Sequence, residues 1–76
     1  NATKSSIKIY PNPVTTSFTI NTSEKIISVE LYDVLGRKSQ NFSSEKNHNV
    51  EKLINGIYFL KIKTDKNEYI EKLIKQ

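Results

Sequence analysis

The fold is decided by one stretch, Leu53-Ile54-Asn55-Gly56-Ile57-Tyr58-Phe59-Leu60-Lys61-Ile62-Lys63-Thr64. It joins Asn55-Gly56, a dipeptide that suits the positive φ angles of tight hairpin turns, to a run rich in β-branched and aromatic side chains. In this run Tyr58, Leu60 and Ile62 share one face, while the opposite face changes from apolar to charged. A strand that begins apolar on both faces is typical of the middle of a sheet. We therefore expect a hairpin at Asn55-Gly56 that leads into a central β-strand.

Six further segments alternate apolar and polar side chains between turn residues. We expect them to form strands at residues 7–10, 16–20, 26–34, 37–42, 48–53 and 68–75. Strand 26–34 is expected to bury Ile27, Val29 and Leu31, and the polar strand 37–42 suits a sheet edge. Seven short strands with no 3.6-residue period predict an all-β fold, namely a small seven-stranded immunoglobulin-like antiparallel β-sandwich. A closed barrel is the structural alternative.

The chain has 76 residues, enough for one small domain of marginal stability. It contains no cysteine, so neither a disulfide nor a thiolate metal site can stabilise it. No apolar run approaches the roughly 20 residues that a membrane-spanning helix needs, and we expect no signal peptide within these residues. We interpret residues 1–6, which are small and polar, as a linker. Because the chain starts at Asn1 rather than Met, we expect it to be a fragment or the C-terminal module of a longer protein.

The net charge of +4 comes mostly from lysines, which are interleaved with eight acidic residues. Arg37 is the single arginine, although arginine is the preferred residue for bidentate recognition of phosphates and bases. The lysines are better suited to keeping strand edges soluble. We therefore expect no nucleic-acid partner.

Candidate catalytic and metal-binding residues are scarce. The single histidine, His48, lies in a polar stretch and is expected on the surface. The two aspartates, Asp33 and Asp65, lie near turns, where they commonly accept backbone hydrogen bonds, and calcium would need about six to eight oxygen ligands. Gly36 and Gly56 fall in separate turns and cannot form one phosphate-binding loop. The sequence therefore predicts no catalytic residue, no metal site and no cofactor, and we expect that the protein is not an enzyme.

Four motifs follow one another in an order that can be compared with known protein families. They are Tyr10-Pro11-Asn12-Pro13, residues 29–37 ending in Gly36-Arg37, residues 53–62 containing Asn55-Gly56, and Glu71-Lys72-Leu73-Ile74-Lys75. In this order and spacing they resemble the C-terminal sorting domain (type A-like) of the type IX (Por) secretion system of the Bacteroidetes. The resemblance covers about residues 7–76.

This resemblance implies a non-catalytic signal that directs an upstream cargo domain of the same chain across the outer membrane. The implied partners are the type IX secretion machinery, including its outer-membrane translocon, its shuttle and a sortase-like protease. The protease would cut in or just before residues 1–6. The protein would pass through the periplasm to the cell surface or be secreted. The alternative function is a carbohydrate-binding or structural accessory β-sandwich of a secreted enzyme.

Two of these motifs can be interpreted in more than one way. Tyr10, Pro11, Asn12 and Pro13 are either a recognised motif or a rigid turn, and we favour the turn. In the last strand Tyr69, Glu71 and Leu73 share one face, with Ile70, Lys72 and Ile74 on the other.

Neither face of this strand is cleanly polar, which predicts either a buried lysine stem or an exposed apolar stripe that marks a partner site. The extreme C-terminus is also the part that the resembling family uses. We expect translocon recognition at Lys72, Leu73, Ile74 and Lys75, and regard an edge-strand dimer as possible.

Overall fold

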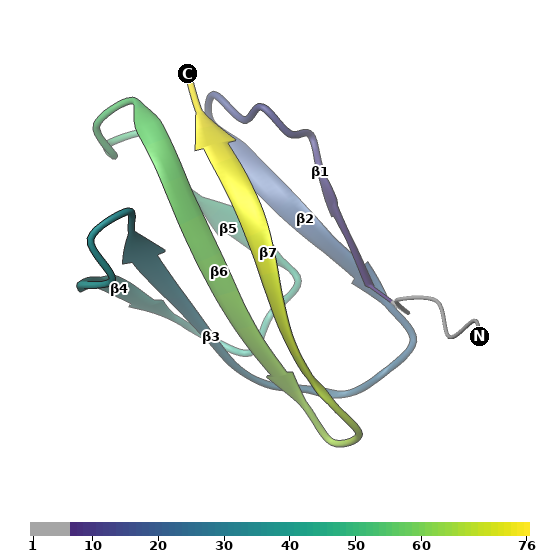
Figure 1. Ribbon diagram of the computed structural model, residues 1–76. Helices are drawn as coiled ribbons and strands as arrows, with labels where there is room; N and C mark the ends of the chain where they lie inside the picture. The colour runs from purple at the N-terminus through teal and green to yellow at the C-terminus, as the bar shows by residue number, and fades with distance from the viewer. Residues whose placement is uncertain (1–6) are drawn as a thin grey trace.

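The structure, a computed structural model, describes residues 7–76. These residues form seven β-strands and no helix (Figure 1). The strands are β1 (Ile7–Tyr10), β2 (Ser17–Thr22), β3 (Ile26–Asp33), β4 (Lys38–Phe42), β5 (Asn47–Asn49), β6 (Gly56–Thr64) and β7 (Glu68–Lys75). The expected linker at residues 1–6 lies outside the described residues.

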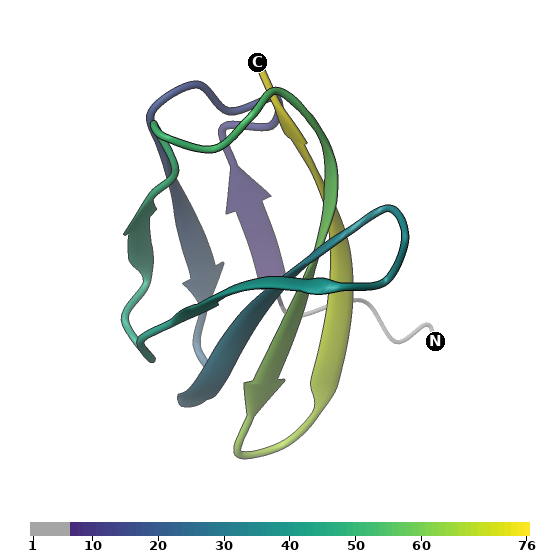
Figure 2. The same ribbon diagram turned by 90° about the vertical axis from the view of Figure 1, so that its left-hand side faces the viewer.

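The strands form two separate sheets, one in the order β1-β2-β5 and one in the order β4-β3-β6-β7. All neighbouring strands are antiparallel. The sheets face each other as two layers (Figure 2). This arrangement confirms the predicted seven-stranded antiparallel β-sandwich and rules out the closed barrel.

The core lies between the two layers, and β6 is central to it, as predicted. Tyr58, Leu60 and Ile62 on β6 are buried, while Ile57 and Phe59 on the opposite face are 42% and 36% exposed. The other buried apolar side chains come from both sheets and their connections: Ile7, Val14, Phe18, Ile20, Ile26, Val29, Leu31, Val50 and Leu73. The strand predicted at residues 37–42 corresponds to β4 and lies at a sheet edge, as expected from its polar sequence.

The start of β3 departs from the predicted pattern. Its pairing with β6 shifts register between Ile26 and Ser28. Such an irregularity changes which residues face the core, and Ile26 is buried while Ile27 is 51% exposed. The prediction that Ile27 faces the core is therefore wrong, whereas Val29 and Leu31 are buried as expected.

The prediction of a hairpin at Asn55-Gly56 is also wrong. β5 pairs with β2 in one sheet and β6 pairs with β3 and β7 in the other, so the segment between them crosses from sheet to sheet. The strand predicted at residues 48–53 ends at Asn49, because Asn49 Oδ1 accepts the Glu51 N–H and the Val50 carbonyl accepts the Leu53 N–H. These hydrogen bonds turn the chain away from β2. Gly56 has a φ angle of 155°, and Asn55 has no positive φ.

Candidate recognition site on the last strand

The last strand, β7, lies at the edge of the four-stranded sheet and pairs with β6 along its whole length. Its side chains alternate between the two faces of the sheet. Leu73 is fully buried and Lys75 is 6% exposed, whereas Lys72 is exposed and Ile74 is partly exposed. Of the four predicted recognition residues, only Lys72 and Ile74 therefore present their side chains on the outer face. Leu73 is a core residue.

Of the two alternatives that the sequence left open for this strand, the structure shows the exposed apolar side chain. Ile70 is 68% exposed, and Lys72 on the same face is exposed rather than buried along its stem. Lys75, on the opposite face, is buried, and its Nζ donates to the Gln76 carbonyl at 3.3 Å. The sequence did not predict the burial of Lys75.

The Asn12 side chain connects the Tyr10-Pro11-Asn12-Pro13 motif to the last strand. Asn12 Nδ2 donates to the Lys72 carbonyl at 2.8 Å, and Asn12 Oδ1 accepts the Ile74 N–H at 3.0 Å. A side-chain amide carries donors and an acceptor, as a peptide group does. Asn12 therefore bonds the edge of β7 as a neighbouring strand would.

Val14 extends this cover along the strand. The Val14 N–H donates to the Ile74 carbonyl at 2.7 Å, and the Gln76 N–H donates to the Val14 carbonyl at 2.8 Å. These bonds form a parallel bridge between Val14 and Lys75. Residues 12–14 and the C-terminal half of β7 thus form one site, although they lie at opposite ends of the sequence. The segment Pro11-Asn12-Pro13, where we expected a rigid turn, therefore contacts β7 through the side chain of Asn12.

Gly36 and Arg37 belong to the hairpin between β3 and β4. Gly36 has a φ angle of 82°, as expected for a turn glycine. Asp33 Oδ1 accepts the backbone N–H groups of Leu35 and Arg37, and Arg37 Nε donates to Asp33 Oδ2 at 3.0 Å. The hydrogen bond from the Arg37 backbone is the main reason why the pKa of Asp33 is lowered. The Gly36-Arg37 motif therefore has a structural role in the hairpin: Gly36 adopts the turn conformation and Arg37 bonds Asp33.

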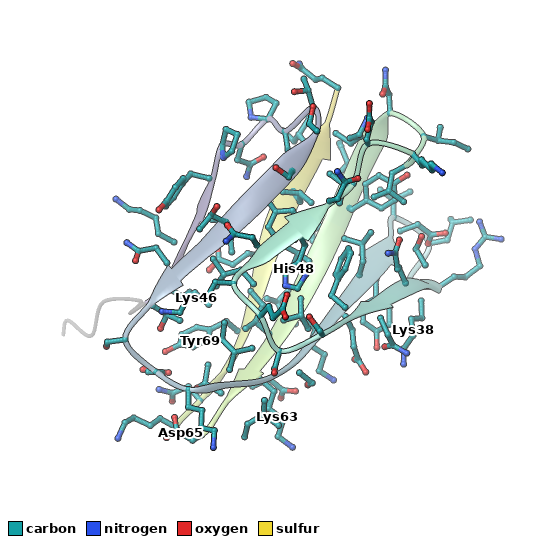
Figure 3. All side chains as sticks on the ribbon, turned by 180° about the vertical axis from the view of Figure 1, so that it is seen from behind. Lys38, Lys46, His48, Lys63, Asp65 and Tyr69 are labelled. Carbon is teal, nitrogen blue, oxygen red and sulfur yellow. The ribbon has the colours of Figure 1, made fainter. Side chains whose placement is uncertain are left out.

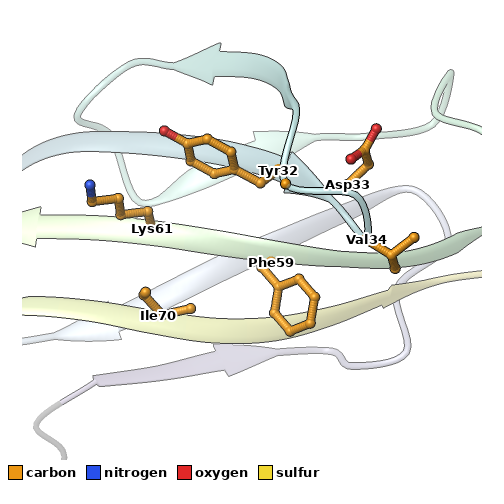
Figure 4. Close-up of a pocket in the computed structure, with 7 residues that line it drawn as sticks. Tyr32, Asp33, Val34, Phe59, Lys61 and Ile70 are labelled. Carbon is orange, nitrogen blue, oxygen red and sulfur yellow. The ribbon is translucent and has the colours of Figure 1, made fainter.

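An apolar hollow lies on the outer face of the four-stranded sheet, beside this hairpin (Figure 4). Its volume is about 500 Å³, and it is lined by Tyr32, Asp33, Val34, Gly36, Phe59, Lys61 and Ile70. Val34 is 61% exposed and Ile70 is 68% exposed. The sequence indicated this surface only through the apolar outer positions of β6 and β7. It did not indicate that Val34 of the hairpin joins them.

Ion pairs border the hollow. Glu30 accepts hydrogen bonds from the Tyr32 hydroxyl at 2.9 Å and from Lys38 Nζ at 3.2 Å, and these bonds, the first above all, lower the pKa of Glu30. Lys61 Nζ lies 3.3 Å from Glu68 Oε2, and its hydrogen bond to Glu68 raises the pKa of Lys61. The lowered pKa keeps Glu30 ionised and the raised pKa keeps Lys61 protonated at neutral pH, and each pairs with an opposite charge on the neighbouring strand.

The prediction that His48 is a surface residue is wrong. His48 is 7% exposed, and its ring centroid lies 5.4 Å from that of Phe18 and 4.7 Å from that of Phe42 (Figure 3). Its Nε2 lies 2.6 Å from the Glu45 carbonyl oxygen, which can only accept, so Nε2 carries a proton. Burial lowers the pKa of His48. The reason is register: His48 is paired with Phe18 on β2, and both face the core.

Two other kinds of site were sought in the described range, residues 7–76. This range contains no group of three or more His, Cys, Asp or Glu residues that could hold a metal ion. It also contains no helix that is long and apolar enough to cross a membrane.

Fold and site together define a small β-sandwich whose distinctive surface is an edge strand partly covered by its own chain, next to an apolar hollow. The family model of the secretion system C-terminal sorting domain matches residues 8–76. The chain therefore belongs to that family, as the order of its motifs predicted. No curated protein matches the chain.

Members of this family are sorting signals for type IX secretion and are generally not catalytic. Membership implies an interaction with the type IX secretion system and passage across the outer membrane to the cell surface or the extracellular space.

Proposed function

We propose that this domain directs an upstream cargo through the type IX translocon, and that the machinery recognises the site where residues 12–14 meet β7. The observation that carries this proposal is the pair of hydrogen bonds from the Asn12 side chain to the Lys72 carbonyl and the Ile74 N–H. They bring the first and last motifs of the family pattern onto one surface. Within residues 72–75 the machinery would contact the side chains of Lys72 and Ile74. Leu73 and Lys75, which are buried, would hold the strand in position.

We further propose that a sortase-like protease removes the domain by a cut in or just before residues 1–6. The support is family membership together with the position of this polar segment ahead of β1, the first strand of the sandwich. A cut there would release the cargo and leave the seven described strands intact. Mass spectrometry of an exported fusion protein tests this proposal, because the mature product should lack every peptide from β1 onward.

Export of a fluorescent reporter in a type IX-competent bacterium tests the sorting function. The reporter carries an N-terminal periplasmic signal and this domain at its C-terminus. Removing residues 72–76 would also remove the core residue Leu73, so surface substitutions are the better variants. Lys72→Glu combined with Ile74→Thr should reduce export, while Lys52→Glu, an exposed change in the segment that crosses between the sheets, should leave export unchanged.

Two results would contradict these proposals. Periplasmic retention of the unaltered fusion, with the domain folded, would remove the sorting function. Equal export of the Lys72→Glu/Ile74→Thr fusion and the unaltered fusion would place recognition elsewhere on the sandwich.

The carbohydrate-binding alternative depends on the four tyrosines, because the chain has no tryptophan and sugar-binding sites favour aromatic faces. Tyr58 is buried and its hydroxyl donates to the Ile54 carbonyl, and the Tyr69 hydroxyl bonds the Glu24 carboxylate. Tyr32 is half-buried and bonds Glu30. Of the four tyrosines only Tyr10, at 47%, is exposed. A sugar-binding platform commonly needs several exposed rings on one surface.

A further inference from the structure

The outer edge of β7 is divided into a covered half and an open half. In an antiparallel strand, alternate residues turn their backbone groups toward the same side. The Lys72 carbonyl and both backbone groups of Ile74 bond residues 12–14, so the even-numbered residues face away from β6. By the same alternation Glu68 and Ile70 present their N–H and C=O groups at this edge, as does the N–H of Lys72. No hydrogen bond from a described residue reaches these groups.

The side chains beside the open half form an apolar surface that also carries two lysines, Lys63 and Lys72, with no ion pair to a described residue. Ile70 is 68% exposed and lines the hollow together with Phe59 on β6 (Figure 4). Lys72 is directly opposite Phe59 in the β6–β7 register. Lys61 and Lys38 each have a carboxylate partner, but no carboxylate of the described residues pairs with Lys72. This surface therefore lacks one apolar neighbour for Ile70 and one negative charge for Lys72.

We propose that the open half of β7 binds an extended segment of a partner protein, which adds to the four-stranded sheet as a fifth strand. Strand addition satisfies the open backbone groups and extends the rows of side chains across the sheet. The partner strand would place an apolar side chain next to Ile70 and an acidic side chain two positions away, next to Lys72. Asn12 occupies the edge beyond Lys72, so the site ends there and covers residues 68–72.

This inference deepens the proposed function, on which it rests, because it names the kind of segment that the sorting machinery would present. The site is also distinct from the covered half of the edge. The cover formed by Asn12 and Val14 stays in place when the partner strand binds, and it fixes the register by blocking addition past Lys72.

The test is a titration of the ¹⁵N-labelled domain with a synthetic probe, a seven-residue capped peptide in which valine and threonine alternate. One valine is replaced by glutamate in the acidic probe and by lysine in the basic probe. We expect the acidic probe to shift the amide resonances of Ile70 and Lys72 and to slow their hydrogen exchange. The amides of Tyr69 and Glu71, which face β6, should change less.

A charge exchange provides the matched control. Lys72→Glu should weaken binding of the acidic probe about two- to fivefold, as expected for one surface charge pair, and should strengthen binding of the basic probe. Lys52→Glu, which carries the same charge change far from this edge, should alter neither. Ile70→Thr keeps the backbone groups but removes the apolar contact, so it should weaken both probes.

Three results would overturn the inference. The first is the absence of any shift at millimolar peptide, and the second is a set of shifts along the β4 edge instead. The third is protection of the Ile70 and Lys72 amides that grows with the concentration of the domain alone, because the occupant would then be a second copy of this chain. If the acidic probe binds while the fusion is not exported, the proposed sorting function fails and the strand-addition site remains.

Discussion

Asn12 and Ile74 lie 62 residues apart in the sequence, yet the Ile74 N–H donates to Asn12 Oδ1 at 3.0 Å. The other end of the same side-chain amide donates to the Lys72 carbonyl at 2.8 Å. A sheet edge with open N–H and C=O groups is a site where other strands can add. Asn12 therefore both fastens the first motif to the last strand and determines which half of that strand stays open.

Asn12→Ala should destabilise the domain by about 1–2 kcal/mol, because each lost hydrogen bond contributes on the order of 1 kcal/mol net. Chemical denaturation measures this change, and hydrogen exchange at the Ile74 amide should accelerate. Asn41→Ala is the matched control, since Asn41 is an exposed residue of the β4 edge whose side chain makes no hydrogen bond to another residue of the range 7–76. An unchanged exchange rate at Ile74 would show that the Asn12 contact does not protect this strand.

Leu73→Ala should cost about 2–5 kcal/mol, as is usual when a fully buried leucine is truncated. Lys72→Ala, at the exposed neighbouring position, should change the free energy of unfolding by less than about 0.5 kcal/mol. Urea denaturation of both variants measures the difference. Similar losses for the two would mean that β7 does not alternate between core and surface as described.

The sequence was sufficient to predict the features that depend on local pattern. The alternation from Ile57 onward identified the buried and exposed faces of β6, and the polar composition of residues 37–42 identified an edge strand. Gly36 was predicted to lie in a turn, and it does so with a φ of 82°. The order of the motifs was also enough to identify the family.

The incorrect predictions concern features that depend on distant parts of the chain. Asn55-Gly56 has the composition of a hairpin, but its flanking strands pair with β2 and β3, in different sheets. Ile27 fits the alternation of its strand, but because of the register shift at the start of β3 the side chain of Ile26 is buried in place of that of Ile27. His48 has polar neighbours in sequence and aromatic neighbours in space.

The arrangement of the candidate recognition site could be predicted only in part, for the same reason. The sequence placed recognition on residues 72–75 but could not show which of these side chains would be core. The contact between Asn12 and β7 joins segments that have no local signal for each other. The contact forms because the segment that connects β1 to β2, two neighbours in the three-stranded sheet, runs alongside the C-terminal end of β7 in the other sheet.

Gly36→Ala should cost about 1–2 kcal/mol, because a residue with a Cβ atom is disfavoured at a φ of 82°. Apart from Gly36 and its two chain neighbours, no heavy atom of the described residues lies within 4 Å of the position that the new Cβ would occupy, so the cost comes from the backbone alone. Gly36→Asn should cost less, since asparagine tolerates this conformation better than alanine. Thermal unfolding compares the two variants. Equal losses would indicate that the conformation of the hairpin changes instead.

Lowering the pH from 8 to 5 should destabilise the domain through His48. Burial lowers the pKa of His48 in the folded state below its ordinary value of about 6.5. The unfolded chain therefore takes up a proton at a higher pH than the folded domain does. The stability that comes from neutral His48 is fully present above pH 6.5 or so and is lost as the pH falls from there toward the folded pKa.

Urea denaturation at several pH values between 5 and 8 measures this effect. His48→Gln, and independently His48→Phe, should flatten the dependence whatever their own cost in stability, because neither side chain titrates. The pKa values of Glu30 and Asp33 are lowered from ordinary carboxyl values, so these two groups stay ionised over most of this range. An unchanged slope in both variants would assign the pH dependence to a group other than His48.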